Sequence, residues 1–175
     1  MLAGCRFPCR RFFPVIALAV CAFLAPGAVT AAIFSIPATD LPAEVKAAKA
    51  EGRRLLVFFE LSDCPECRTM EREVFSDRRV QRQFDRLYRT ARIAVDTKGA
   101  IVDLDGEARA PLEIARKLTV YATPSFAFFL PDGTLEYRHT GNLSADEFLR
   151  LGQFVFGAIY EEQSFADYAQ SSAHH

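Results

Sequence analysis

Two cysteines, Cys64 and Cys67, stand two residues apart in the segment Cys64-Pro65-Glu66-Cys67. A nearly continuous apolar run precedes them and a helical pattern follows, so we expect the pair where a buried strand meets a helix. Free N–H groups at the start of a helix favour negative charge, and hence a thiolate. The spacing therefore predicts dithiol chemistry, in which Cys64 attacks a disulfide and Cys67 resolves the mixed disulfide.

The first 31 residues have the three-part layout of a secretory signal peptide. Three arginines lie within the first 11 residues, an apolar run follows, and small residues allow cleavage after Ala31 or Ala32. The apolar run is short for a membrane span, although an uncleaved anchor helix is the alternative. We therefore expect residues 1–31 to be a signal peptide and the protein to be periplasmic.

Removal of this segment changes the cysteine count and the charge. Residues 1–31 hold three of the five cysteines, so only Cys64 and Cys67 remain. Such a short disulfide loop adds little stability, so chemistry explains the pair better. The segment also holds three arginines and no acid, so its loss takes the net charge from −1 to −4. This charge gives no reason to expect nucleic acid as a partner.

Zinc sites use the same cysteine spacing, but a structural zinc site needs four Cys or His ligands. The exported chain adds only His139, far along the sequence, and the terminal His174 and His175. The sequence therefore predicts no metal and no cofactor other than the redox-active disulfide Cys64–Cys67.

The rest of the chain alternates between helices and strands. We expect helices over about 42–51, after Cys67, from Ser76-Asp77, from Pro111, and from Ser144 to about Tyr160. Strands are expected at 53–61, 92–95, 125–130 and 135–140, with a turn at Pro131-Asp132-Gly133-Thr134 and a polar insertion at 97–109.

This order predicts an α/β fold with a central mixed β-sheet flanked by helices. We expect an extended lead-in over 32–41, one domain over 42–170, and a disordered tail over 171–175. Glu71 and Glu73 are expected on a solvated face of the helix after Cys67.

Thr123-Pro124 stands directly before the third strand, where a proline can be cis. The array of strand, Cys64–Cys67 pair, helix, Thr-Pro, strand, turn, strand and helix resembles the thioredoxin family over residues 42–160. In that family the cis-proline loop faces the cysteines and binds the substrate backbone. The resemblance therefore implies a thioredoxin fold, and substrate-binding roles for Thr123, Pro124, Pro65 and Glu66.

A narrower resemblance covers the segment around the cysteines. The stretch from Phe59 to Asp77 is similar to bacterial periplasmic thioredoxin-like proteins found in sulfur-oxidation operons. The tail from Gln163 to Tyr168 also resembles the end of that group.

Two residues depart from the thioredoxin pattern. Phe58 stands where thioredoxins carry a buried acid as a proton shuttle, and Asp63 replaces the usual aromatic residue before the first cysteine. Glu60 has the same strand parity as Phe58 and lies closer to Cys64, so it is our candidate general base for Cys67. The alternative is an exposed carboxylate at the end of the strand.

The charges beside the cysteines predict the direction of electron flow. Asp63 and Glu66 disfavour a thiolate on Cys64, whereas Arg68 and the helix terminus favour it. Strong disulfide oxidants owe their character to a stabilised reduced form. The sequence therefore predicts a reducing or moderately poised couple.

We therefore expect a periplasmic thiol–disulfide oxidoreductase that reduces protein disulfides as a monomer. The resemblance implies an inner-membrane electron donor that recharges it. The alternatives are a disulfide oxidase or isomerase, and a non-catalytic thioredoxin-fold binding protein or metallochaperone.

Overall fold

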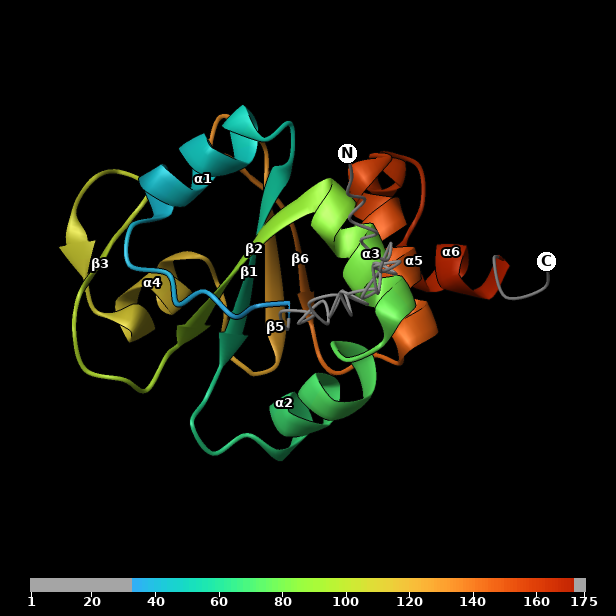
Figure 1. Ribbon diagram of the computed structural model, residues 1–175, viewed down its shortest axis with the longest axis horizontal. Helices are drawn as coiled ribbons and strands as arrows, with labels where there is room; N and C mark the ends of the chain where they lie inside the picture. The colour runs from blue at the N-terminus through green and yellow to red at the C-terminus, as the bar shows by residue number, and fades with distance from the viewer. Residues whose placement is uncertain (1–32, 172–175) are drawn as a thin grey trace, which may run out of the picture. The chain divides into compact units, whose positions relative to one another are not determined.

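A mixed four-stranded sheet forms the centre of the protein in the computed structural model, which describes residues 33–171 (Figure 1). The strand order is β2-β1-β5-β6. β1 (Arg54–Glu60) runs parallel to β2 (Tyr88–Ala94) and antiparallel to β5 (Ser125–Phe129), and β6 (Leu135–Thr140) pairs antiparallel with β5. The expected signal peptide and residues 172–175 of the expected tail lie outside the described residues.

Helices cover both faces of this sheet (Figure 1). One face carries α1 (Leu41–Ala50) and α4 (Pro111–Lys117). The other face carries α2 (Pro65–Thr69), the π-helical turn η1 (Met70–Val74), α3 (Arg78–Leu87) and α5 (Ala145–Phe156). The sequence-based prediction of a mixed sheet flanked by helices is thus confirmed.

Three short elements complete the described chain. A hairpin of β3 (Ile101–Val102) and β4 (Ala108–Arg109) occupies the stretch that the sequence predicts as a polar insertion. After α5 come the 3-10 turn η2 (Ile159–Glu161) and α6 (Phe165–Ser171), whose aromatic residues pack against Phe154 of α5. Within residues 33–171, no helix combines the length and the apolar character needed to cross a membrane.

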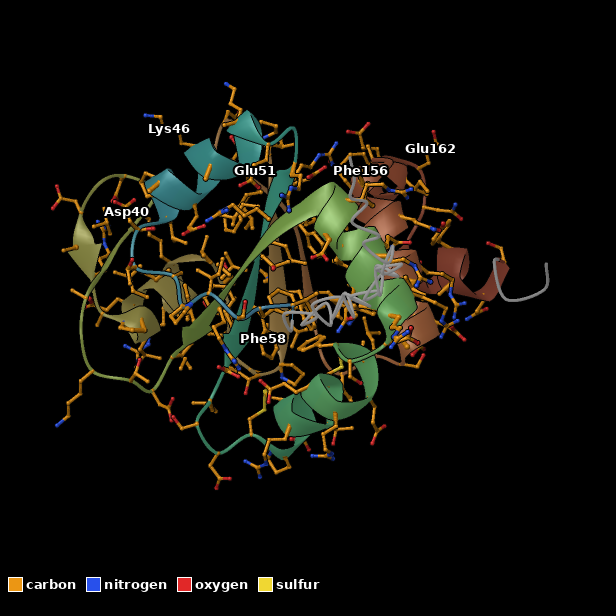
Figure 2. All side chains as sticks on the ribbon, in the orientation of Figure 1. Asp40, Lys46, Glu51, Phe58, Phe156 and Glu162 are labelled. Carbon is orange, nitrogen blue, oxygen red and sulfur yellow. A yellow bond between two sulfur atoms is a disulfide. The ribbon has the colours of Figure 1, made fainter. Side chains whose placement is uncertain are left out.

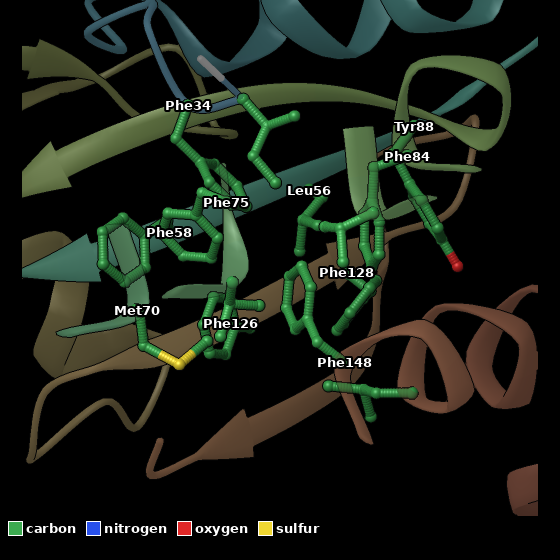
Figure 3. Close-up of a cluster of buried hydrophobic side chains, with 14 of the residues drawn as sticks. Phe34, Leu56, Phe58, Met70, Phe75, Phe84, Tyr88, Phe126, Phe128 and Phe148 are labelled. Atoms are coloured by element: carbon green, nitrogen blue, oxygen red, sulfur yellow. The ribbon is translucent and has the colours of Figure 1, made fainter. Parts of the chain in front are cut away.

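β1, the strand that leads to the cysteines, is covered on both faces. Its residues from Leu55 to Phe59 are all buried. Successive side chains of a strand point to opposite faces, so Leu56 and Phe58 enter one core cluster while Val57 and Phe59 enter the other. Figure 2 labels Phe58 on the central sheet, and Figure 3 shows the aromatic side chains around it.

Two boundaries differ from the sequence prediction. β2 begins at Tyr88, directly after α3, and not at Arg92. The polar residues at its start hide the strand, although Tyr88 and Ala91 are buried. α5 ends at Phe156 because Ala158 adopts the left-handed conformation, with φ 55°, which stops the helix before Tyr160.

The segment before α1 is anchored in the core and is not extended throughout. Ile33 and Phe34 lie in a turn, and both side chains are buried. The Phe34 ring lies 5.2 Å from the Phe58 ring and 4.9 Å from the Phe75 ring (Figure 3). Further on, Pro37 forms a parallel bridge with Arg92 of β2. This segment therefore completes the aromatic layer beneath the helix that carries Cys67.

We predict that Phe34→Ala lowers the free energy of unfolding by about 3–5 kcal/mol, because it removes a buried ring and leaves a cavity. Ile36→Ala is the matched control, since Ile36 is 40% exposed, and should cost about 1 kcal/mol or less. Urea denaturation of the purified proteins measures both values. Equal losses in the two variants would contradict the anchoring role of Phe34.

Candidate functional site

Cys64 and Cys67 form a disulfide at the start of α2. Cys64 is the N-cap residue of this helix, and its Sγ accepts a hydrogen bond from the Cys67 N–H at 3.1 Å. Pro65 occupies the first turn, where a missing N–H costs nothing, and Glu66 beside it is exposed. Both cysteines are buried, with exposed fractions of 4% and 2%. The backbone thus offers an N–H to the sulfur that is expected to become a thiolate.

The loop between β1 and α2 is held by one carboxylate at the end of β2. Asp96 accepts hydrogen bonds from the backbone N–H and the hydroxyl of Ser62, each at 3.1 Å. Because Ser62 lies two residues before Cys64, this contact fixes the path by which the chain leaves β1. Asp96 is a positioning residue that the sequence analysis did not identify.

The Thr123–Pro124 peptide bond is cis and lies beside the disulfide. The Thr123 hydroxyl is 3.5 Å from Cys64 Sγ. Ser125, which follows Pro124, anchors the loop by donating a hydrogen bond from its hydroxyl to the Ala122 carbonyl at 2.8 Å. β5 follows immediately and pairs with β1. The sheet therefore brings Thr123 and Pro124 next to Cys64, although 59 residues separate Thr123 from Cys64 in the sequence.

An apolar hollow of about 290 Å³ adjoins Thr123. Its wall includes Leu61, Leu112 and Tyr121, which are 40%, 44% and 78% exposed. These exposed side chains form an apolar surface beside the cis-proline loop. This hollow lies on the Thr123 side of the loop that carries Cys64.

A larger cavity of about 680 Å³ reaches both cysteines from the other side of that loop. Its lining also includes Glu60, Glu71, Arg92 and Lys98. No three metal-ligating side chains gather anywhere in the described part of the chain. Acidic and basic side chains thus line the cavity beside the disulfide.

Glu60 lies in this cavity and forms a two-pronged ion pair with Arg92. Glu60 Oε1 accepts from Arg92 Nε at 2.7 Å, and Oε2 accepts from Arg92 Nη2 at 2.5 Å. The Glu60 side chain is 14% exposed. It is thus a largely buried, paired carboxylate, which does not match the alternative of an exposed strand-end acid.

The sheet register explains this pairing. Arg92 of β2 stands opposite Phe58 of β1, so both side chains point to the same face, and Glu60 shares that face because it lies two residues further on. Burial tends to lower the pKa of Arg92, but the hydrogen bonds that Arg92 donates to Glu60 and Glu71 outweigh it, and the pKa is raised overall. Arg92 is therefore a permanent cation in the cavity wall.

Arg92 and Lys98 are site residues that the sequence analysis missed. Arg92 falls within a predicted strand, but its contact with Glu60 depends on which residues of β1 and β2 are paired. Strand parity alone places Glu60 on the correct face and gives no register.

The charged residues directly before and after the two cysteines, Asp63 and Arg68, also form an ion pair. Arg68 Nη1 lies 3.3 Å from an oxygen of Asp63, whose side chain is 96% exposed. Exposed pairs of this kind are strongly screened by water. Glu66 takes no part in this pair and lies in the first turn of α2.

The sequence matches the model of the thioredoxin-like domain family over residues 41–156. A thioredoxin from Thermus thermophilus is 31% identical, with 69% of this chain and 87% of that chain covered and a TM-score of 0.54. A thioredoxin-fold protein from Helicobacter pylori is 13% identical, with 84% and 96% covered and a TM-score of 0.66.

A putative disulphide-isomerase from Bacteroides thetaiotaomicron is 24% identical, with 74% and 96% covered and a TM-score of 0.56. No curated protein matches the chain. The family match, the fold and the Cys64–Cys67 disulfide agree with one another. The chain therefore belongs to the thioredoxin-like family and is a thiol–disulfide oxidoreductase.

Proposed function

We propose that this protein is exported to the periplasm by residues 1–31 and there reduces disulfides in other proteins. The observation that carries this proposal is the Cys64–Cys67 disulfide at a helix start, with Thr123–Pro124 beside Cys64 and a paired carboxylate, Glu60, in the adjoining cavity. No cofactor other than the disulfide itself is needed for this exchange.

The reaction runs through two exchanges. In the dithiol form, the Cys64 thiolate attacks a client disulfide, forms a Cys64–client bond and releases one client thiolate. Cys67 then loses its proton and attacks Cys64 Sγ, which forms the Cys64–Cys67 bond and releases the second client thiolate. The client gains two electrons and the protein loses two. We assign Glu60 as the base that accepts the Cys67 proton, because both residues line the same cavity.

The apolar hollow and the cis-proline loop support a protein as the client. Leu61 and Tyr121 offer exposed apolar surface next to Thr123 and Pro124, and we propose that the client chain lies across them. We assign Pro65 and Glu66, which are exposed at the start of α2, to the same binding surface. In this proposal an extended client chain lies beside Cys64.

The local charges support the direction of electron transfer. Glu66 stands between the cysteines, and its carboxylate disfavours a thiolate on Cys64. Arg68 is already engaged with Asp63, so it compensates only in part. A less stabilised thiolate makes the dithiol a better electron donor. We further propose that the protein works as a monomer and is recharged by a donor in the inner membrane.

We predict that Cys64→Ser abolishes the reduction of insulin disulfides, because the attacking sulfur is lost. Cys67→Ser should instead accumulate mixed disulfides, since nothing resolves the Cys64–client bond. Turbidity of precipitating insulin measures the first result, and non-reducing gels of periplasmic extract measure the second. Wild-type activity in Cys64→Ser, or the absence of any trapped client, would contradict the proposal and favour a binding protein.

We predict that Glu60→Gln slows the resolving step on the order of 100-fold, because Cys67 loses its proton acceptor. The attack by Cys64 should proceed at its normal rate. Rapid-mixing kinetics with an aromatic disulfide that releases a coloured thiolate separate the two steps. Equal resolving rates in the variant and the wild-type protein across neutral pH would remove Glu60 from the mechanism.

A further inference from the structure

The sequence predicts that Glu71 lies on a solvated helix face, but in the structure its carboxylate is paired with Arg92. Glu71 belongs to η1, four residues after Cys67, and its Oε1 accepts a hydrogen bond from Arg92 Nη2 at 2.6 Å. Its side chain is 42% exposed and lines the cavity that reaches both cysteines. Glu73, two residues further on, lines a different hollow. Of these two acids, only Glu71 therefore lines the cavity beside the disulfide.

Arg92 is shared between two carboxylates. The same nitrogen, Nη2, contacts Glu60 Oε2 at 2.5 Å and Glu71 Oε1 at 2.6 Å. Glu60 comes from the central strand and Glu71 from the helix that carries Cys67. One cation thus pairs with two carboxylates, whose like charges repel each other.

The other charged groups near Glu60 do not replace Arg92. Arg68 of α2 and Lys98 of the loop after β2 also line the cavity, but Arg68 pairs with the exposed Asp63. Asp96, just after β2, accepts hydrogen bonds from Ser62. Neither Arg68 nor Lys98 contacts Glu60 or Glu71 among the described ion pairs. The trio of Glu60, Arg92 and Glu71 is therefore a local unit.

We propose that Glu71 is a positioning residue for the resolving step: by sharing Arg92 Nη2 with Glu60, it sets how Arg92 holds the carboxylate that accepts the Cys67 proton. This inference rests on the proposed function. In the step concerned, the Cys67 proton moves to Glu60, the Cys67 sulfur bonds to Cys64 Sγ, and the Cys64–client bond breaks. The client sulfur leaves with that electron pair as a thiolate.

The same contact ties the catalytic helix to the sheet. Glu71 lies in the wide π-helical turn closed by the bond from the Phe75 N–H to the Met70 carbonyl at 2.9 Å. Such turns interrupt the regular helix and are frequent at functional sites. Here the turn presents Glu71 to Arg92 one turn beyond Cys67, so the helix that carries the resolving thiol and the strand that carries its base share one cation.

The test is the pH dependence of each step in the reaction of the reduced protein with the aromatic disulfide. The first coloured thiolate reports attack by Cys64, and the second reports resolution by Cys67. We expect Glu71→Gln to move the half-maximal pH of the second phase down by about 0.5 units or more, because it removes the second negative charge that shares Arg92 with Glu60. The plateau rate of the second phase should fall, because a better neutralised carboxylate is a weaker base.

Glu73→Gln is the matched control, since it removes the same charge from the same helix turn outside the cavity. It should change neither phase. Arg92→Lys keeps the charge but cannot hold both carboxylates as the planar fork does, so the half-maximal pH of the second phase should rise. An unchanged second phase in both Glu71→Gln and Arg92→Lys would overturn the inference.

The double variant Glu60→Gln/Glu71→Gln separates this inference from the proposed function. If Glu71 acts through Glu60, adding Glu71→Gln to Glu60→Gln produces no further change. A full Glu71 effect in the absence of the Glu60 carboxylate would show direct action on Cys67 and contradict the inference. If Glu60→Gln alone leaves the second phase unchanged, the assigned base fails, whatever Glu71 does.

Discussion

The burial of β1 on both faces is the constraint on which the rest of the structure depends. Its residues from Leu55 to Phe59 contribute to two separate core clusters, so the strand has no room for an uncompensated charge. Phe58 accordingly packs against Phe126 and Phe75, with ring centroids 5.3 and 5.2 Å apart. The polar chemistry begins only at Glu60, where the strand leaves the core and its carboxylate meets Arg92.

This arrangement joins the core to the site. The chain that leaves β1 must turn at once into α2, and Asp96 holds the turn through Ser62. β5 pairs with β1 along its length, so the cis-proline loop that precedes β5 arrives beside Cys64. β2 pairs on the opposite side and delivers Arg92. The two neighbours of one strand thus supply the two sides of the disulfide, one apolar and one charged.

The sequence alone predicts much of the fold and part of the candidate site. The cysteine spacing and the apolar run before it predict the pair and its strand, because both depend on local pattern. The place of Thr123-Pro124 beside Cys64 came only from the resemblance to the thioredoxin family, because that contact is long-range. Glu60 was also accessible from strand parity. Arg92, Glu71 and Asp96 were not, because their contacts depend on the register of β1 with β2 and on the π-helical turn at Met70–Val74. The start of β2 was missed because Arg89 and Thr90 interrupt its apolar pattern.

The central claim is that Cys64 and Cys67 form a reducing dithiol couple, and its reduction potential tests that claim most directly. Equilibration of the protein against defined thiol buffers measures the fraction of intramolecular disulfide at each potential. For a reducing couple we expect a value near about −270 mV, in the range of thioredoxin. A value near about −120 mV, typical of a disulfide-forming oxidant, would contradict it, as would failure of the two cysteines to form an intramolecular disulfide.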